Sequence, residues 1–380
     1  MTRNKKKIIR AVTVSQSHGF VEPMIPYLKK IYEIQLLSSP GEKLDKICQE
    51  YQIVGHRVGM YRRMSPLKDM KSLFQIIKIF RKEKPYMVHS MTPKAGLLCM
   101  LAAWITRVPR RVHTFTGLVW PTASGLTRKI LMFTDWVTCT CATHIVPEGQ
   151  GVLNDLQKHI TKKTMKVLGY GNVRGVDMVR FSRREEVLKV AKNIRKEGVF
   201  TFVFVGRIVR DKGINELVEA FTQLYKKYPC IRLLLVGKYE TELDSLKKET
   251  MEKINTLSYI ETVGPKYGDD LLAYYVASDC FVFPSYREGF PNTVLEAGAM
   301  ELPSIVTDIN GSREIIVNNK NGIIIPSKNV EALFRAMEHM FVDDEKRMYM
   351  VSQARSMISK RFEQSFVQKC FYEFYNEIIS

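Results

Sequence analysis

The sequence predicts an α/β protein made of two doubly wound, Rossmann-like domains. Short apolar segments alternate with longer amphipathic segments along most of the 380 residues, and this alternation is typical of strand–helix units in a parallel sheet. The pattern is completed once before about residue 170 and starts again at Phe200. A chain of this length is long enough for two substantial cores.

The first array opens with an expected strand at residues 7–14, which ends at the polar loop 15–19. The period of the apolar residues separates the later strands from the helices. Helices are expected at 21–31, 44–51, 66–84, 94–106 and 124–141, and strands at 33–37, 53–58, 86–90, 111–115 and 144–147. Together these elements form an N-terminal domain over residues 1–170.

The second array opens with a strand at 202–205, followed by Gly206-Arg207 and by Asp211-Lys212-Gly213 at the start of a helix. Further strands are expected at 231–236, 259–262, 280–283 and 304–307, and further helices at 294–300, 330–341 and 362–379. The polar, charge-rich stretch 171–196 is interpreted as a linker. A second domain over 197–361 follows, with a separate C-terminal helix at 362–380.

The segment 285–296 is the strongest candidate for a functional site. It connects the carboxyl end of the strand at 280–283 to the next helix, which is where open α/β sheets bind ligands. Asn292 and Thr293 are residue types that cap a helix start, and unpaired N–H groups there attract anions. Glu288 and Glu296 flank this turn, which suits a ligand with phosphate at one end and sugar hydroxyls at the other. The alternative is a purely structural loop, which any doubly wound domain contains.

Two cations form the second candidate site. Arg207 follows a strand, and Lys212 lies at the start of the next helix. Their charge-assisted hydrogen bonds could stabilise a departing diphosphate. The alternative is that both are ordinary surface side chains beside a helix.

Composition excludes several classes of protein. The longest apolar run, 95–108, is too short to span a bilayer, and no signal peptide is apparent at the start. Seven cysteines without a Cys-x-x-Cys pair argue against a disulfide framework and a structural zinc site. No Asp-x-Asp motif occupies a suitable strand end, so we expect neither a cofactor nor a metal. A cytosolic location is expected.

The net charge of +19 comes entirely from the first half of the chain. Residues 1–180 contain 30 basic and 11 acidic residues, whereas residues 181–380 contain 28 of each. The basic residues between Arg57 and Lys94 gather on and around one expected helix: Arg62, Arg63, Lys68, Lys71, Lys78, Arg81, Lys82 and Lys84. An anionic membrane surface fits this segment better than nucleic acid, because aromatic residues for stacking on bases are sparse. A solvated basic face is the alternative.

The segment 284–297 resembles the E-x7-E signature of the retaining GT-B glycosyltransferases of family 4. The resemblance is closest to the bacterial enzymes that build capsule, O-antigen and other lipid-linked glycans. It implies two domains facing a cleft, with the last helix crossing back onto the first domain. It also implies that Arg207 and Lys212 bind the donor diphosphate, that Glu288 holds hydroxyls of the donor sugar, and that Glu296 holds the ribose. The donor-binding set is completed by Gly206, Gly289, Phe290, Pro291, Asn292 and Thr293.

Three weaker matches lie in the first half of the chain. His113, in the segment 111–118, resembles the family histidine that contacts the donor sugar, although a lone histidine is more often structural. Gly19 fits the glycine loop that approaches the donor phosphates, and His18 beside it is a weaker candidate. Residues 169–181 resemble the family's interdomain segment, with Arg174 where asparagine is usual.

These features together predict a retaining, metal-independent hexosyltransferase. It would move a hexose or N-acetylhexosamine from a UDP-linked sugar to a polyprenyl-linked or other lipid-linked acceptor. It would act as a peripheral protein at the cytoplasmic face of the plasma membrane, without binding nucleic acid. Two other classes stay open: a GT-B nucleotide-sugar epimerase, which needs no acceptor, and a basic nucleic-acid-binding protein without catalysis.

Overall fold

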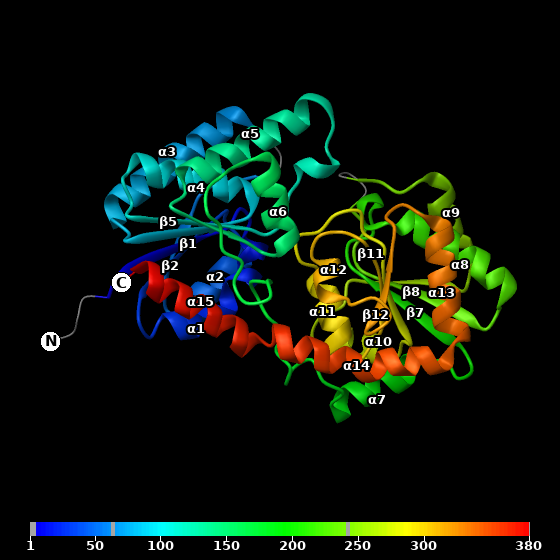
Figure 1. The fold of residues 1–380 in the computed structure, drawn as a ribbon. Helices are drawn as coiled ribbons and strands as arrows, with labels where there is room; N and C mark the ends of the chain where they lie inside the picture. The colour runs from blue at the N-terminus through cyan, green and yellow to red at the C-terminus, as the bar shows by residue number, and fades with distance from the viewer. Residues whose placement is uncertain (1–4, 62–64, 241–243, 380) are drawn as a thin grey trace. The chain divides into compact units, whose positions relative to one another are not determined.

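The computed structural model describes residues 5–61, 65–240 and 244–379 and divides the chain into two compact units. Unit 1 comprises Met1–Gly175 together with Gln364–Ser380, and unit 2 comprises Val176–Glu363. Each unit is built on a six-stranded parallel sheet with helices packed on it (Figure 1). The prediction of two doubly wound α/β domains is therefore confirmed.

The sheet of unit 1 has the strand order β3-β2-β1-β4-β5-β6. Its strands are β1 (Lys7–Ala11), β2 (Glu33–Ser38), β3 (Val54–Arg57), β4 (Met87–Met91), β5 (Arg110–Phe115) and β6 (His144–Pro147). All neighbouring pairs are parallel. Because β1 pairs with both β2 and β4, the strand order reverses at β1, and such reversal points are where doubly wound sheets bind ligands.

Helices cover both faces of this sheet (Figure 1). They are α1 (Ile25–Leu28), α2 (Glu42–Tyr51), α3 (Pro66–Glu83), α4 (Pro93–Ile105), α5 (Gly125–Cys141), α6 (Gln150–His159) and α15 (Gln364–Ile379). Buried side chains of α3, α4, α5 and α6 form one apolar cluster with the sheet, and those of α1, α2 and α15 form another. Burial of these two faces stabilises unit 1.

The sheet of unit 2 has the strand order β12-β11-β10-β7-β8-β9. Its strands are β7 (Phe200–Val205), β8 (Ile231–Val236), β9 (Ile260–Gly264), β10 (Cys280–Phe283), β11 (Ser304–Thr307) and β12 (Gly322–Ile325). Nearly all their residues are apolar because both faces are covered. The strand order reverses between β7 and β10, which pair in parallel.

The helices of unit 2 complete its layers. They are α7 (Glu185–Ile194), α8 (Ile214–Lys227), α9 (Lys248–Thr256), α10 (Gly268–Val276), α11 (Asn292–Ala299), α12 (Ser312–Ile315), α13 (Val330–Val342) and α14 (Asp344–Phe362). Helix α8 packs against α9 and α13, α10 packs against α7, and α11 packs against α14. One continuous apolar core joins them to the sheet.

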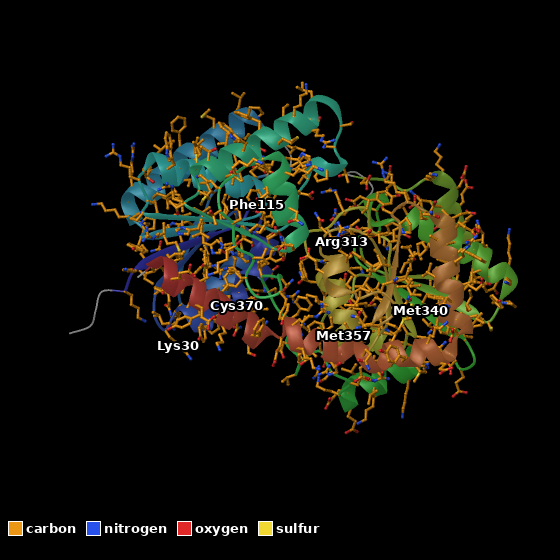
Figure 2. The ribbon with its side chains drawn as sticks, in the orientation of Figure 1. Lys30, Phe115, Arg313, Met340, Met357 and Cys370 are labelled. Carbon is orange, nitrogen blue, oxygen red and sulfur yellow. The ribbon has the colours of Figure 1, made fainter. Side chains whose placement is uncertain are left out.

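The last two helices divide between the units. Helix α14 ends at Phe362, Glu363 is extended, and α15 then packs on the sheet of unit 1. There the hydroxyl of Tyr375 lies 2.5 Å from Nδ1 of His89. Figure 2 shows Met357 of α14 in unit 2 and Cys370 of α15 in unit 1.

Two regions differ from the sequence-based expectations. The expected linker 171–196 is not a free connection after Gly175, because α7 buries Val187 and Ala191 in the core of unit 2. The expected helix at 21–31 is replaced by one short 3-10 turn, Glu22–Met24, and one turn of α-helix, Ile25–Leu28. Pro23 and Pro26 lack the N–H group that a continuous helix would need there.

Candidate functional site

The candidate site of unit 2 lies where its strand order reverses. Gly206 and Arg207 follow the end of strand β7, and Pro284 and Ser285 follow the end of β10, its neighbour in the sheet. The chain is crowded at this edge, since a Cβ atom on Gly237, which follows β8, would lie 1.7 Å from the carbonyl oxygen of Gly206. The strand ends therefore bring the predicted cation loop and the predicted acidic loop together within one unit.

Lys212 and Glu288 form an ion pair at this point. Nζ of Lys212 binds Oε1 of Glu288, and the two side chains are only 13% and 16% exposed. Oγ of Ser285 lies 2.8 Å from the same carboxylate oxygen. The ammonium of Lys212 also lies 5.3 Å from the ring centroid of Phe283, the last residue of β10. A cation and a carboxylate are thus held in place, each able to exchange its partner for a ligand.

Arg207 has a different partner from Lys212. Its Nη1 atom lies 2.9 Å from Oε2 of Glu240, and the guanidinium is partly exposed. Burial lowers the pKa of Arg207, but the hydrogen bond with Glu240 and nearby carboxylates raise it overall. The guanidinium is therefore a permanent cation that can approach an anionic ligand.

The acidic loop is fixed to the start of α8 by contacts that the sequence does not reveal. The backbone N–H of Tyr286 donates to the carbonyl of Asp211 at 2.8 Å, and the hydroxyl of Tyr286 lies 2.7 Å from Glu216. Burial, and then the hydrogen bond to Glu216, raise the pKa of Tyr286. Nη2 of Arg287 lies 3.2 Å from Oδ2 of Asp211. These contacts fix the loop that carries Glu288 to the start of α8, and so keep Glu288 next to Lys212.

Gly311 is a further residue that sequence reasoning missed. It has a φ of +74°, and a Cβ atom there would lie 2.3 Å from the carbonyl oxygen of Gly289. The same atom would also crowd Phe290 and Pro291. The turn after β11 therefore packs directly on the loop that precedes α11, so only glycine fits at this position.

Helix α11 begins at Asn292, two residues earlier than the expected helix 294–300. Its N-cap is Pro291, and among the described residues no side chain caps this end. Asn292 and Thr293 are thus first-turn residues rather than caps. Phe290 is buried against Phe362, with ring centroids 5.4 Å apart. The first-turn N–H groups form the kind of helix end that binds phosphate.

Glu296 lies within α11 and is buried. The hydroxyl of Tyr275, on α10, donates to its Oε2 atom at 3.3 Å. The structure therefore places one of the two predicted acids on the loop and the other inside the helix, each with a hydrogen-bond donor.

His113 belongs to unit 1 and is a core residue within β5, inside the expected strand 111–115. It is buried in the middle of the sheet, with Nδ1 2.8 Å from Oγ of Ser90. Gly96 of α4 covers the imidazole, since a Cβ atom there would lie 2.4 Å from Cε1 of His113. The strand continues to Phe115, and the residues beyond its end are Thr116 and Gly117. His113 therefore packs in the core, and its contact with the donor sugar stays a prediction.

His18 and Gly19 lie in the 3-10 turn Ser15–Phe20 that follows β1. His18 is buried, and neither ring nitrogen has a hydrogen-bond partner among the described residues. Gly19 has an ordinary φ, and a Cβ atom there would meet no protein atom within 4 Å. Nothing in the described structure therefore requires glycine at position 19.

The buried histidines predict that unit 1 loses stability in acid. Burial, and then the charges of Arg10 and Lys43, lower the pKa of His18 to about 4, and burial lowers the pKa of His113 to about 3. The unfolded chain binds these protons near pH 6.5 and the folded chain does not, so each histidine removes about 1.4 kcal/mol per pH unit below pH 6.5. This loss continues until the pH reaches the folded pKa.

Tryptophan fluorescence during urea unfolding measures this effect, because Trp104, Trp120 and Trp136 all lie in unit 1. The variant His113→Asn keeps a hydrogen-bonding group for Ser90 but does not titrate. Its unfolding free energy should fall less steeply than that of the wild type between pH 6 and pH 4.5. Equal slopes would show that His113 does not drive the acid sensitivity.

The segment 169–181 spans the boundary between the units. Oδ1 of Asn172 accepts the N–H of Gly175 at 2.6 Å, and Phe181 is buried in the core of unit 2. Oδ1 of Asp177 accepts the N–H groups of two following residues at 3.0 Å. These contacts give the segment a structural role.

Comparison with known proteins identifies the class of this chain. Residues 187–357 match the family model of group 1 glycosyl transferases, and residues 11–134 match a glycosyl transferase 4-like model. The capsular polysaccharide biosynthesis glycosyltransferase CapM of Staphylococcus aureus is 30% identical over 377 residues, covering 98% of both chains. An Escherichia coli UDP-Gal:α-D-GlcNAc-diphosphoundecaprenol α-1,3-galactosyltransferase is 28% identical and covers 91% of this chain and 92% of its own.

Solved structures agree with this result at the level of the fold. The Anabaena protein HepE, solved in complex with UDP, is 17% identical, with a TM-score of 0.80 and coverage of 98% of this chain and all of its own. A glycosyltransferase from Rickettsia africae is 21% identical, with a TM-score of 0.78 and full coverage of both chains. The full-length match to CapM and the two family models show that the chain belongs to the family-4 glycosyltransferases of the GT-B fold.

Proposed function

We propose that the chain transfers a hexose or N-acetylhexosamine from a UDP-linked sugar to a lipid-linked glycan acceptor, with retention of configuration and without a metal. The observation that carries this proposal is the Lys212–Glu288 pair, which is held beside Ser285 where the strand order of unit 2 reverses. A nucleotide sugar carries both groups that such a pair can bind, a diphosphate for the cation and sugar hydroxyls for the carboxylate.

The relatives support the choice of donor and acceptor. HepE was solved with UDP and with UDP-glucose, and the E. coli relative uses UDP-galactose and a diphosphoundecaprenol-linked sugar. A relative from Campylobacter jejuni, 22% identical over 88% of this chain, is an N-acetylgalactosaminyltransferase that acts on another diphospho-undecaprenol-linked sugar. We propose that this chain also uses a UDP-linked sugar as donor and a polyprenyl-linked glycan as acceptor.

The donor diphosphate would lie between Arg207, Lys212 and the N-terminus of α11. Binding would draw Lys212 from Glu288 to phosphate, and Glu288 would then accept hydrogen bonds from hydroxyls of the donor sugar. Glu296 would hold the ribose, and the backbone from Gly289 to Thr293 would meet phosphate. Positive charge placed before reaction at the departing diphosphate lowers the barrier, because the charge develops there in the transition state.

Retention would follow from attack on the face that the diphosphate leaves. The acceptor hydroxyl oxygen forms a bond to the anomeric carbon as the bond from that carbon to the phosphate oxygen breaks. The hydroxyl proton passes to the departing phosphate, so no protein nucleophile is required. The roles of Arg207 and Lys212 in this step are to bind and neutralise the leaving group.

Calorimetric titration with UDP-, GDP- and dTDP-sugars in the presence of a chelator tests the donor site. We expect binding of the UDP-sugar alone, and this binding should weaken strongly in Lys212→Ala. Lys227→Ala is the matched control, because Lys227 forms an exposed ion pair with Glu338 elsewhere in unit 2. Binding only after a divalent metal is added would contradict metal independence, and product formed from donor alone would indicate an epimerase.

The same titration, repeated with the variant Gly19→Ala, tests whether Gly19 belongs to the donor site. Because a methyl group at Gly19 meets no described protein atom, the variant should keep the melting temperature of the wild type. If the donor phosphates approach Gly19, its affinity for the UDP-sugar should fall about tenfold. Unchanged affinity would remove Gly19 from the proposed donor site without affecting the roles of Lys212 and Glu288.

A further inference from the structure

Several helices of unit 1 carry large apolar side chains that the described residues leave exposed. On α3, Leu67, Met70 and Phe74 are exposed at a spacing of three and four residues, and Phe74 is 63% exposed. This spacing places them in one stripe along the helix. The stripe faces away from the core, because α3 buries Leu73, Ile76 and Phe80 on its other side.

Helix α5 repeats this arrangement. Leu126, Ile130 and Phe133 are exposed at spacings of four and three residues, and Phe133 is 61% exposed. Trp136 stacks on Phe133 with ring centroids 5.7 Å apart. Two large aromatic rings thus lie together at the surface, although burying each of them would be favourable.

Helix α4 connects the two stripes. It packs between α3 and α5 (Figure 1), and its partly exposed residues Leu97, Leu101 and Trp104 follow one another at spacings of four and three residues. We call the apolar residues of these three helices the outer apolar face: Leu67, Met70, Phe74, Leu97, Leu101, Trp104, Leu126, Ile130, Phe133 and Trp136. Exposed apolar side chains gathered on three packed helices mark a candidate site of interaction.

The exposed charges beside this face are basic. On α3 they are Lys68, Lys71, Lys78, Arg81 and Lys82, and on α5 they are Arg128 and Lys129. Asp69 of α3 is partly buried and paired with Lys94 at 2.8 Å, and Asp135 of α5 is buried. Arg62 and Arg63, which belong to the same basic segment of the sequence, lie outside the described residues.

We infer that the outer apolar face inserts into the headgroup region of a bilayer that contains anionic phospholipid. Apolar and aromatic side chains ringed by lysine and arginine are the combination that surface-bound helices use, since the rings enter the interface while the cations bind headgroup phosphates. A basic face alone would need no exposed Phe or Trp, and a second copy of this basic face would be repelled by like charge. None of the described helices is long and apolar enough to cross a bilayer.

The tryptophans provide a direct measurement. Of the three in the chain, Trp104 and Trp136 are 57% and 49% exposed on the outer apolar face, whereas Trp120 is 2% exposed. Mixing the protein with vesicles of phosphatidylcholine and phosphatidylglycerol should shift the emission to shorter wavelength. Brominated acyl chains should quench it. Vesicles of phosphatidylcholine alone should produce a much smaller change.

Two variants separate insertion from simple charge attraction. Phe74→Ser with Phe133→Ser removes two exposed rings without opening the core, and it should lower vesicle partitioning at least tenfold. Lys71→Glu with Lys78→Glu should lower it to a similar extent, with a stronger effect at low salt. Tyr267→Ser with Val342→Ser is the control, because it removes two exposed apolar side chains from unit 2 and should leave partitioning unchanged.

Three outcomes would overturn the inference. Vesicle binding that the Phe74→Ser and Phe133→Ser pair leaves intact would reduce it to charge attraction. A dimer that these changes dissociate in light scattering, without vesicle binding, would identify the face as a self-association surface. Equal binding to neutral vesicles would exclude recognition of anionic lipid. None of these measurements depends on transferase activity, so their outcome and the test of the proposed function are independent of each other.

Discussion

Replacing Lys212 with Ala should lower turnover at least 100-fold while changing the free energy of unfolding by only about 1 kcal/mol. Lys212 is held against Glu288 in a site that is largely shielded from water, where a cation aimed at developing charge has its greatest effect. Loss of one such preorganised group typically costs about 100- to 1,000-fold in kcat. The folded state loses much less, because Glu288 keeps its hydrogen bond with Ser285.

Steady-state kinetics with the UDP-sugar, together with urea unfolding of the same preparations, measures both effects. Lys227→Ala again serves as the control, since its ion pair with Glu338 is exposed and should contribute little. Wild-type turnover in Lys212→Ala would remove Lys212 from the donor site. A fall in turnover matched by an equally large loss of folding stability would show that the residue is structural.

A double variant distinguishes two explanations for the loss. If Lys212 served only to neutralise Glu288, then changing Glu288 to Gln in the Lys212→Ala background would restore turnover. If Lys212 binds the diphosphate, as we propose, the double variant should be no faster than Lys212→Ala. The two residues are in direct contact, so their effects are not expected to add.

The fold could be predicted from the sequence because its strands are short, nearly continuous apolar runs. The run from Phe202 to Val205 and the run from Cys280 to Phe283 can only be buried strands flanked by helices, and both were placed correctly. Helix α14 was missed because charged side chains are distributed around the whole helix and few of its residues are buried, so its sequence lacks a clear apolar stripe. Strand β12 was also missed, although it is no shorter than β10 or β11.

Only those parts of the site that are formed by residues close together in the sequence could be predicted. The loop at Glu288 and the turn at Lys212 were both identified, but their pairing depends on the adjacency of β7 and β10, which the sequence does not state. Gly311 lies 22 residues from Gly289, and its role appears only when the two backbones meet. His113 was expected within the strand 111–115 and lies within β5, but its burial beneath Gly96 depends on the packing of α4, which the sequence does not show.

The second large effect is expected at Gly213, where a single methyl group should destabilise unit 2 by several kcal/mol. Gly213 is the N-cap of α8 with a φ of +72°, and a Cβ atom there would lie 2.1 Å from the carbonyl oxygen of Pro284. The opposing atom is backbone, so no rotamer change can relieve the contact. Either α8 or the loop that carries Ser285 and Glu288 must move, and Gly213→Ala should therefore also lose donor binding.

Gly198→Ala separates the effect of the contact from that of backbone conformation. Gly198 has a φ of +70° in the same unit, but a Cβ atom there would meet nothing within 4 Å. This control should cost only about 1 kcal/mol, the ordinary penalty for a non-glycine residue in the left-handed region. Gly213→Ala should cost about 3–5 kcal/mol, as expected when packed backbone is forced apart. Equal losses of unfolding free energy in the two variants would show that the loop at Pro284 moves away from α8 at little cost. A loop that moves so easily would not hold Lys212 and Glu288 in a fixed position before the donor binds.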